Sequence, residues 1–378
     1  MSKNIKPALS AIPSDLVSVA DFNRVAKSHI QPSIYEYIVG GGADEVSLKR
    51  NGSAFDDWLI LPRVLRDVTH GGTQTKILDE MLRHPILLAP VAFQKMVHPL
   101  GELATLEGAD CLETKMVVST LATKTIETIA NASSQHHWFQ LYFQENRDFT
   151  LSLVKRAERA GYTKLVVTID APLHGIRNRA QRAGFQLPEG ITPVNLKDRP
   201  PLPRKILDSH QSVVFQGMMS EAPTWQDIEW LLKVSTLPVI LKGVLHPDDA
   251  KIAKDKGIAG LIISNHGGRT LDCVPSSLDV LPSIRQSLGE NYPLLLDGGV
   301  ERGTDIFKAL ALGANAVLIG RPQIFSLSVA GALGVASMLR ILREELEVTM
   351  ALAGTATIDQ ITPQCIQHVP GRTNHNHV

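Results

Sequence analysis

The chain has 378 residues, 44% of them hydrophobic, and its 38 Lys and Arg balance 38 Asp and Glu, so the formal net charge is zero. This neutral balance is atypical of nucleic-acid-binding proteins and of proteins held at membranes by basic patches, so we expect neither partner. The cysteines Cys111, Cys273 and Cys365 form neither a metal-binding spacing nor a disulfide framework, and the N-terminus has no apolar run typical of a signal peptide, which together favour a cytoplasmic protein.

From residue 85 the chain alternates short apolar runs with longer amphipathic or Ala-rich segments. Residues 1–84, which come before this alternation, are mostly helical in pattern. The apolar runs lack the polar alternation of half-exposed strands and are typical of parallel strands that are covered on both faces. They are Ile86–Ala89, Met116–Ser119, Trp138–Tyr142, Leu165–Ile169, Pro238–Leu241, Leu261–Ser264, Leu294–Leu296 and Ala316–Ile319. The clearest predicted helices are Gly101–Lys115, Arg147–Ala160, Thr224–Val234, Pro247–Lys256, Arg302–Leu312 and Ser326–Leu352.

Eight strand–helix alternations favour an α/β protein built as a (β/α)8 TIM barrel, although a doubly wound open sheet would show the same pattern. The proline-rich stretch 172–223 after the fourth strand is too long for an ordinary connection. It is either a functional lid or a surface excursion without function. We expect one domain, made of the N-terminal helical segment 1–84, the barrel 85–362 with this lid, and a tail 363–378 that is disordered from about residue 365.

Polar residues and glycines follow every predicted strand, at the end where parallel α/β proteins bind ligands. In chain order they are Pro90-Val91-Ala92, Ser119-Thr120, Gln140 and Tyr142, Thr168 and Asp170, Lys242-Gly243, Ser264–Arg269, Asp297-Gly298-Gly299 and Gly320-Arg321. The groups after strands seven and eight match the phosphate site of TIM barrels, and the alternative is ordinary turn glycine. The chain lacks a GxGxxG after a strand and lacks GxxxxGK, which disfavours a Rossmann dinucleotide site or a P-loop.

His266 and Lys242 are the candidate reactive side chains. Asp170 can lie across the barrel mouth from His266 and raise the basicity of its imidazole. Lys242 could form a Schiff base, neutralise an anion or make a salt bridge. No HExxH motif occurs, and His136 and His137 would point to opposite faces of a strand, so we expect no metal. The residues alone therefore predict a barrel enzyme for an anionic small molecule, with a cofactor or substrate that carries phosphate.

Together these segments resemble the FMN-dependent α-hydroxy acid oxidase and dehydrogenase family, which includes lactate oxidase, glycolate oxidase and hydroxymandelate oxidase. The resemblance runs from about residue 15 to 362. It rests on Tyr35-Glu36-Tyr37, APVAFQKM (89–96), FQLY (139–142), TIDAP (168–172), LKGV (241–244), SNHGGR (264–269), DGGVERGTD (297–305) and IGRP (319–322). The lid sequence AGFQLPEGITPVNL (183–196) is most similar to the lactate-oxidase and hydroxymandelate-oxidase branches.

The resemblance implies oxidation of an (S)-2-hydroxy acid, such as lactate, mandelate or a longer acid, to the 2-keto acid. His266 would be the base, Asp170 would stabilise the imidazolium, and Tyr142 would bind the substrate hydroxyl. Tyr37, Arg177 and Arg269 would hold the substrate carboxylate, with Leu121 at the substrate tail. The FMN contacts would be Pro90, Val91, Ala92, Ser119, Gln140, Thr168, Lys242, Ser264, Asp297, Gly298, Gly299, Gly320 and Arg321.

Three positions depart from the family pattern. Glu301 stands where an arginine usually binds phosphate, so it should weaken FMN binding unless it turns outward and leaves Arg302, Arg321 and backbone N–H groups to bind. Ile38 replaces the second tyrosine of a Tyr-Tyr pair. Leu121 replaces the tryptophan of glycolate oxidases and leaves room for a tail larger than that of glycolate, and the ring of Phe93 could favour an aromatic acid.

Several alternatives stay open on the sequence. The α-hydrogen could leave as a proton or as a hydride. Dioxygen, giving hydrogen peroxide, is the expected acceptor, and a soluble dehydrogenase with another acceptor is the alternative. Two further hypotheses are a flavin-independent lyase that uses Lys242 as a Schiff base, and a relic with only a binding role. By resemblance we also expect a homotetramer.

Overall fold

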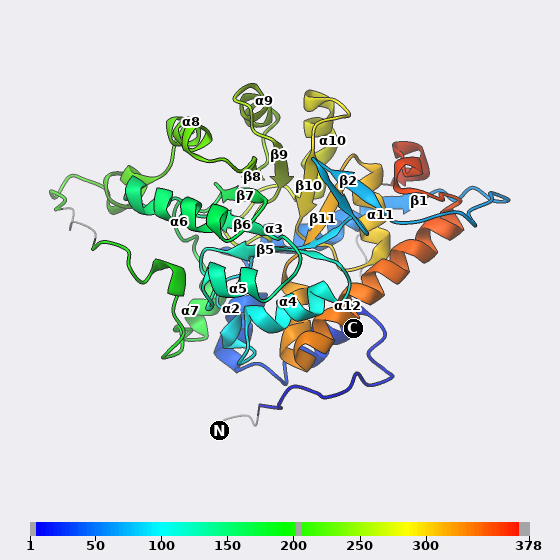
Figure 1. The fold of residues 1–378 in the computed structure, drawn as a ribbon, viewed down its shortest axis with the longest axis horizontal. Coiled ribbons are helices and arrows are strands. Elements are labelled where there is room, and N and C mark those ends of the chain that lie inside the picture. The colour runs from blue at the N-terminus through cyan, green and yellow to red at the C-terminus, as the bar shows by residue number, and fades with distance from the viewer. Residues whose placement is uncertain (1–4, 202–205, 370–378) are drawn as a thin grey trace.

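The computed structural model describes residues 5–201 and 206–369, and its centre is a closed barrel of eight parallel strands (Figure 1). Their order around the barrel is β10-β11-β4-β5-β6-β7-β8-β9. The strands are β4 (Ile86–Leu88), β5 (Lys115–Ser119), β6 (Trp138–Leu141), β7 (Lys164–Thr168), β8 (Val239–Val244), β9 (Gly260–Ile263), β10 (Leu294–Asp297) and β11 (Ala316–Ile319). Each coincides with a predicted apolar run, so the barrel is confirmed and the open sheet is excluded.

Helices surround the barrel. They are α4 (Glu102–Asp110), α5 (Ile126–Asn131), α6 (Arg147–Arg159), α8 (Trp225–Val234), α9 (Pro247–Asp255), α10 (Ser277–Leu288), α11 (Gly303–Ala311) and α12 (Arg321–Ala353). The local sequence explains several of their ends. Pro247 occupies the first turn of α9, where its missing N–H costs nothing, and Gly257 just beyond the helix has a φ of +84°. The six predicted helices are confirmed to within several residues at their ends, and α5 and α10 are additional.

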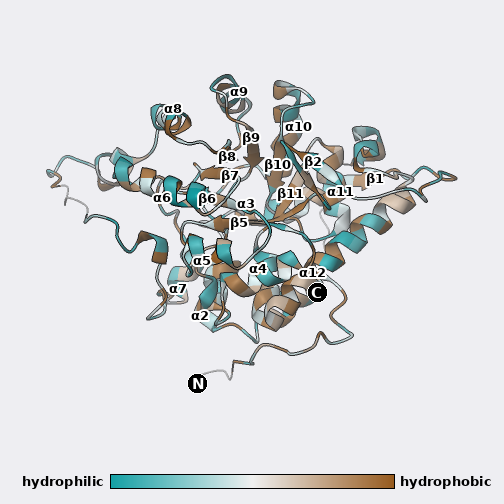
Figure 2. Ribbon diagram, viewed as in Figure 1, coloured by the Kyte–Doolittle hydropathy of each residue, from teal (hydrophilic) through white to brown (hydrophobic). Residues whose placement is uncertain are grey.

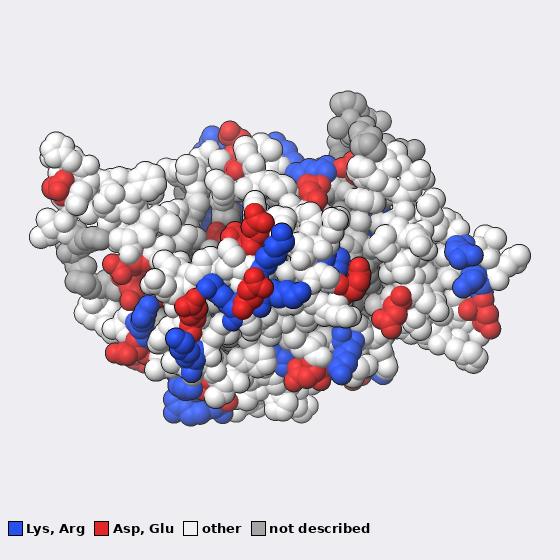
Figure 3. Space-filling view, turned by 90° about the horizontal axis from the view of Figure 1, so that it is seen from above, with Lys and Arg blue, Asp and Glu red and all other residues white. Residues whose placement is uncertain are grey.

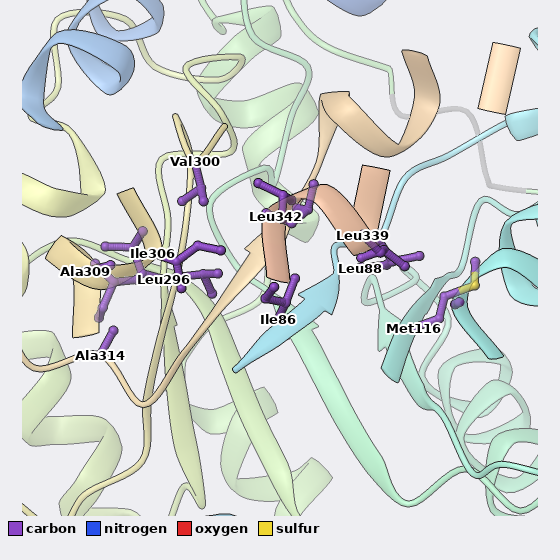
Figure 4. Packing of buried hydrophobic residues seen from close by; sticks show 14 of the residues in the cluster. Ile86, Leu88, Met116, Leu296, Val300, Ile306, Ala309, Ala314, Leu339 and Leu342 are labelled. Carbon is purple, nitrogen blue, oxygen red and sulfur yellow. The ribbon is translucent and has the colours of Figure 1, made fainter. Parts of the chain in front are cut away.

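The strands alternate between two cores, as a period of two residues requires. On β4, Ile86 and Leu88 belong to the core between barrel and helices, whereas Leu87 belongs to the core inside the barrel. Figure 4 shows Ile86 and Leu88 in the outer cluster together with Leu339 and Leu342 of α12. Figure 2 shows the same organisation, with hydrophobic strands at the centre and hydrophilic faces on the surrounding helices.

A short hairpin, β2 (Thr75–Ile77) and β3 (Glu80–Leu82), closes the amino-terminal end of the barrel. Its Ile77 and Leu82 pack in the core inside the barrel with residues of all eight barrel strands. Its Glu80 accepts a hydrogen bond from the indole of Trp138 at 3.4 Å and forms an ion pair with the buried Lys164 at 3.0 Å. This end is therefore sealed, and only the carboxyl ends of the strands are open to a ligand.

The N-terminal segment is less helical than predicted. It contains α1 (Val19–Ala26), α2 (Pro32–Val39), α3 (Val46–Ser53) and a 3-10 turn at Ala54–Asp57, followed by three short strands. The first of these, β1 (Trp58–Ile60), pairs antiparallel with β12 (Ile366–His368). The predicted disorder of the tail is thus wrong for 366–368, because β1 supplies a hydrogen-bonding edge. Residues 370–378 lie outside the described part of the chain.

Helix α12 is interrupted near its first third. Ala330 and Gly331 have non-helical backbone angles, with φ of +58° at Gly331, so two helices meet at a kink there. By length and composition α12 could cross a membrane, but 72% of its most apolar window is buried inside the protein. It is packed against α1, α4 and α11, which is the setting of a core helix.

The lid leaves the barrel after β7 and extends to one side of it (Figure 1). It contains α7 (Asn178–Arg182), which packs against α2, and short turns at Val194–Leu196, Val213–Gly217 and Met218–Glu221. Its Pro203 lies outside the described residues.

Candidate active site

The strands place a layer of polar side chains directly above the apolar core inside the barrel. On β6, Trp138 faces inward, so Gln140, two residues on, has the same orientation. The same step leads from Val166 to Thr168 and from Ile240 to Lys242 on the neighbouring strands. A further advance of two residues along each chain segment leads past the strand ends, to residues that include Tyr142, Asp170 and His266. Strand periodicity therefore stacks the predicted flavin contacts under the predicted catalytic groups.

A cavity of about 1600 Å³ opens at this end of the barrel. It exceeds the roughly 300–1,000 Å³ of ordinary small-molecule sites, so it has room for a cofactor and a substrate together. Most of the predicted residues line it, namely Tyr37, Pro90, Val91, Ala92, Ser119, Leu121, Tyr142, Thr168, Arg177, Lys242, His266, Arg269, Asp297, Gly298, Gly299, Gly320 and Arg321. Gln140, Asp170 and Ser264 lie behind the wall, and each bonds to a residue that lines it: Ser119, His266 and Lys242 respectively.

His266 and Asp170 form a hydrogen-bonded pair, as predicted. Nδ1 of His266 is 2.8 Å from Oδ1 of Asp170, and the backbone N–H of His266 donates to Oγ of Ser264 at 3.0 Å. The backbone of His266 has a φ of +59°, a conformation that is uncommon outside glycine and that holds the ring at the cavity. Burial alone would raise the pKa of Asp170, but His266 and Lys242 reverse this effect and hold that pKa below its ordinary range. Asp170 is therefore an anion that can stabilise a protonated imidazole, and Nε2 of His266 stays available to a ligand.

Lys242 is a fixed positive charge under the centre of the cavity. Its Nζ donates to Oγ of Ser264 at 2.8 Å and lies 2.9 Å from Oδ2 of Asp297. Burial opposes the charge, but Asp297 and Asp170 outweigh it and raise the pKa of Lys242. A protonated amine cannot attack a carbonyl, so this environment disfavours the Schiff-base hypothesis and favours electrostatic stabilisation of an anion.

Two guanidinium groups converge on the ring of Tyr37. Cζ of Arg269 lies 5.0 Å and Cζ of Arg177 5.5 Å from the ring centroid. Within residues 5–201 and 206–369 neither guanidinium forms an ion pair with a carboxylate, and the buried Nε of Arg177 has no partner. Burial and the neighbouring Arg177 lower the pKa of Arg269 to about 10. Two unneutralised cations this close together require an anionic ligand for full stabilisation.

The lid contributes an aromatic contact to this corner. The ring of Phe185 stacks on that of Tyr37, with centroids 4.0 Å apart and an angle of 11° between the planes. No pattern in the sequence predicts that these two residues pair. Phe185 thereby anchors the lid at the place where the two guanidinium groups meet.

Tyr142 faces the same space as a neutral phenol. Burial is the largest influence on Tyr142 and raises the pKa of its phenol to about 12. Its hydroxyl can therefore donate a hydrogen bond to an oxygen atom at neutral pH.

The part of the cavity next to the carboxyl ends of β10 and β11 contains the predicted glycines. The charged residues there are arranged differently from the prediction. Gly298 and Gly299 have φ of +99° and +83°, and a Cβ at Gly299 would lie 2.1 Å from the carbonyl oxygen of Asn51. These two positions therefore require glycine. Arg321 directs its guanidinium to the backbone carbonyls of Ile38, Gly40 and Gly267 at 2.9–3.0 Å.

Those carbonyls occupy three of the five N–H groups of Arg321, so its predicted role toward phosphate falls mainly to its backbone at the start of α12. Glu301 is among the residues that line the cavity here, and it is exposed to solvent. Partial desolvation and the nearby Asp305 raise the pKa of Glu301. Arg302, the other expected cation, already pairs with Asp56 at 3.6 Å and Asp305 at 3.5 Å.

Several buried polar atoms at the cavity wall lack a hydrogen-bond partner within the described part of the chain, and their chemistry suits FMN. Nε2 of Gln140, Oγ1 of Thr168 and Oδ1 of Asp297 are buried without a hydrogen-bond partner among the described residues. Such atoms are costly unless a ligand binds them. They lie on adjacent or facing strands in the polar layer, where a ring system and its ribityl chain need donors and acceptors. Lys242 and the glycine turns complete a set of groups suited to a flavin with a phosphate.

Sequence reasoning missed several residues that line the cavity. They are Gln94, Met96, His174, Leu196 and Met218. Gln94, Met96 and Leu196 fall inside the segments 89–96 and 183–196 that carry the resemblance, but no role is predicted for them. His174 and Met218 belong to no such segment, and their place at the cavity depends on the folded lid. Phe93, by contrast, lines the cavity as expected, and its backbone N–H donates to the carbonyl of Leu121 at 3.1 Å.

Comparison with known proteins gives consistent matches along the chain. A family model described as FMN-dependent dehydrogenase matches residues 26–368. The chain is 47% identical over 360 residues to an L-lactate oxidase of Alicycliphilus denitrificans, with 94% of this chain and 98% of the relative covered. It is 39% identical over 350 residues to glycolate oxidase 3 of Arabidopsis thaliana, with 92% and 95% covered. The crystal structure of a mandelate oxidase with (S)-2-phenylpropionate is similar at a TM-score of 0.84 and 36% identity, with 93% of this chain and 98% of that chain covered.

Proposed function

The chain belongs to the FMN-dependent dehydrogenase family, and from that premise we propose that it oxidises an (S)-2-hydroxy acid at the His266–Asp170 pair. It is an FMN-dependent 2-hydroxy acid oxidase, with a 2-keto acid as product and dioxygen as acceptor. The observation that carries the assignment of the site is the pair Arg177 and Arg269, two cations without a carboxylate partner among the described residues, beside a histidine whose second ring nitrogen is free.

The substrate carboxylate binds between these guanidinium groups. Planar guanidinium groups suit a carboxylate because they donate paired hydrogen bonds, which fix its orientation as well as its position. The Tyr37 hydroxyl is a third donor, and the stacked Phe185 keeps bulk water away from this corner.

His266 takes a proton from the bound substrate. Its Nδ1 is committed to Asp170, so Nε2 is the accepting atom, and the Asp170 anion stabilises the imidazolium that forms. Tyr142 donates to the substrate hydroxyl or to the oxygen on which charge develops. FMN, which Gln140, Thr168, Asp297 and Lys242 would hold, would supply the two-electron acceptor and would pass the electrons on to dioxygen, giving hydrogen peroxide. This geometry is compatible with two mechanisms. His266 can remove the α-proton, or it can remove the hydroxyl proton while the α-hydrogen leaves as a hydride.

The polar layer would also hold the flavin. Gln140, Thr168 and Asp297 would bind the ring and ribityl chain through their unsatisfied atoms, and Ser119 and Ser264 support them. Lys242 supplies positive charge where reduction places negative charge. Pro90, Val91, Ala92, Gly298, Gly299, Gly320 and the backbone of Arg321 form the rest of the cradle.

The substrate tail lies beside Leu121 and Phe93, which a backbone hydrogen bond holds together. A leucine leaves space for a tail larger than the hydrogen of glycolate, so lactate or a longer acid is the favoured substrate. We further propose one functional domain, a homotetramer and a cytoplasmic location. Free cysteines at 111, 273 and 365 support the last of these.

A panel of 2-hydroxy acids tests the function. The purified protein should be yellow, and under anaerobic conditions its flavin absorbance should bleach with lactate or a longer acid. Admission of air should then restore the colour and release hydrogen peroxide. A colourless protein that FMN cannot reconstitute, or a flavin that no 2-hydroxy acid reduces, would contradict the proposal.

A further inference from the structure

His174 lies in the active-site cavity but has no part in the chemistry described above. It belongs to the start of the lid, three residues before Arg177, and it lines the same cavity as Leu121 and His266. Within the part of the chain that the structure describes, its imidazole makes no hydrogen bond. Both ring nitrogens are therefore available to a ligand.

The histidines with structural roles behave differently. Nε2 of His84 contacts the carbonyl of Leu112 at 3.2 Å, and His137 accepts from the backbone of Met116 at 3.1 Å. Both side chains are buried, and their rings replace missing backbone partners. His174 satisfies no backbone group, so packing does not explain a histidine at this position.

The charges around His174 keep its ring neutral. Enclosure by the cavity wall, and then the charge of Arg177, lower the pKa of His174. Arg269 adds a second positive charge to this corner, and Arg199 and Glu221 face the same cavity from the lid. A neutral imidazole can both donate and accept, so it matches an uncharged polar group better than a second carboxylate.

The remaining wall around the substrate tail is apolar. Phe93, Leu121, Leu196 and Met218 line the cavity there. His174 is exposed to solvent in the open cavity, so water can satisfy its imidazole there. A substrate tail with a hydroxyl group would replace that water as a partner, whereas a purely apolar tail would not.

We propose that His174 is a specificity-determining residue that hydrogen-bonds an uncharged hydroxyl group on the substrate side chain. The enzyme then prefers 2-hydroxy acids with a hydroxylated tail over acids with an apolar tail of the same size. This inference rests on the proposed function, because it assumes that Arg177 and Arg269 bind the substrate carboxylate and that His266 is the base.

The test uses pairs of racemic acids in which a terminal methyl group is replaced by a hydroxyl. One pair is 2-hydroxybutanoate and 2,3-dihydroxypropanoate, and the other is 2-hydroxypentanoate and 2,4-dihydroxybutanoate. For the holoenzyme, kcat/KM should favour the hydroxylated member of at least one pair by about tenfold, the value of one neutral hydrogen bond in a desolvated site. His174→Leu should abolish or reverse that preference while kcat/KM for the apolar member stays within about threefold. His174→Gln, which keeps a donor and an acceptor, should restore part of it.

The exposed His70, which lies outside the cavity, provides the matched control. His70→Leu should leave both ratios unchanged, and bound FMN and thermal melting identify any variant that fails to fold. If the wild type shows no preference in either pair, or if His174→Leu keeps the wild-type ratios with flavin bound, the inference is overturned and the proposed function stands. If no acid reduces the wild-type flavin, the proposed function itself fails.

Discussion

The two arginines of the carboxylate clamp have different structural duties. Nη1 of Arg269 donates to the backbone carbonyls of Tyr37, Ile38 and Gly40 at 2.9–3.0 Å, so Arg269 also holds the turn after α2. Arg177 forms no hydrogen bond of this kind within the described residues, and its buried Nε has no partner. Arg269 thus stabilises the fold and binds the substrate, whereas Arg177 only binds the substrate.

Lysine substitutions distinguish the contribution of each arginine to substrate binding from its contribution to stability. Arg177→Lys and Arg269→Lys should each lower kcat/KM for a 2-hydroxy acid by about 10- to 100-fold, because hydrogen bonds to a charged group contribute about 1.5–3 kcal/mol. Only Arg269→Lys should also lower the melting temperature, since the lysine side chain is one atom shorter and its Nζ would not reach the position of Nη1 beside the three carbonyls. Kinetics and calorimetry on both variants, with the exposed Arg182→Lys as control, measure this. An unchanged melting temperature for Arg269→Lys would contradict the assignment.

Glu301 is the residue at which this chain departs most from a simple phosphate site. Glu301 is a lining residue of the cavity, and partial desolvation and the charge of Asp305 raise its pKa. Above that pKa the ionised carboxylate repels the phosphate, and below it the repulsion is lost. Affinity for FMN should therefore rise as pH falls through the pKa of Glu301.

Glu301→Gln should bind FMN roughly tenfold more tightly than the wild type at pH 8, about 1.4 kcal/mol for one nearby charge. The difference should shrink as pH falls through the raised pKa of Glu301, because the wild-type carboxyl is then protonated. Fluorescence titration of the apoprotein with FMN measures both values, and Glu344→Gln on the exposed face of α12 is the control. Equal affinities for Glu301→Gln and wild type at pH 8 would show that the carboxylate does not face the phosphate.

At the scale of elements, the sequence predicts the eight strands because each is a continuous apolar run, and strand periodicity then predicts which side chains share the polar layer. Asp170 and His266 meet as expected for this reason. The hairpin β2–β3 and the strand β12 are too short to leave a pattern. The kink in α12 at Gly331 arises from tertiary packing: a Cβ there would lie 2.9 Å from the ring of His98. Loop-borne residues such as Phe185 and His174 stay unpredictable without the folded lid.

The hairpin that seals the barrel depends on Glu80. Burial raises the pKa of Glu80, but hydrogen bonds from Thr163 and Lys164 and the charge of Lys115 reverse this and lower it below 4.5. A lowered pKa means that the stabilisation is complete above about pH 4.5 and is lost as pH falls through the folded-state value. Glu80 therefore contributes to stability at neutral pH and not in strong acid.

Glu80→Ala should lower the free energy of unfolding by about 3 kcal/mol at pH 7, because the buried Lys164 loses its shielded partner. Asp79 also contacts Lys164, at 2.7 Å, but is 75% exposed, so Asp79→Ala should cost less than about 1 kcal/mol. Urea unfolding at pH 7 and pH 4 measures both variants. The effect of Glu80→Ala should diminish at pH 4, and a constant effect would contradict the ion-pair account.

At the scale of the whole molecule, four basic side chains of the strand ends and the lid are brought to one cavity, which acidic residues such as Asp297 and Glu301 also line. Figure 3 shows basic and acidic side chains intermingled on one face, as a net charge of zero suggests. Lys242, Arg177, Arg269 and Arg321 nevertheless line one cavity, as the sequence predicts from their positions at the strand ends and the start of the lid. The balance of charges could not predict that Arg321 would be engaged by backbone carbonyls, because those carbonyls belong to turns that only the folded chain brings together.

The central claim is that His266 is the base that starts oxidation of a bound 2-hydroxy acid. The most direct measurement is the rate of flavin reduction in His266→Gln, mixed anaerobically with saturating lactate or the best acid of the panel. The variant should retain stoichiometric FMN and reduce it at least about 10³-fold more slowly than the wild type, the magnitude typical of losing a general base. Reduction at a near-normal rate in a variant with bound flavin would show that His266 is not the base and would contradict the account.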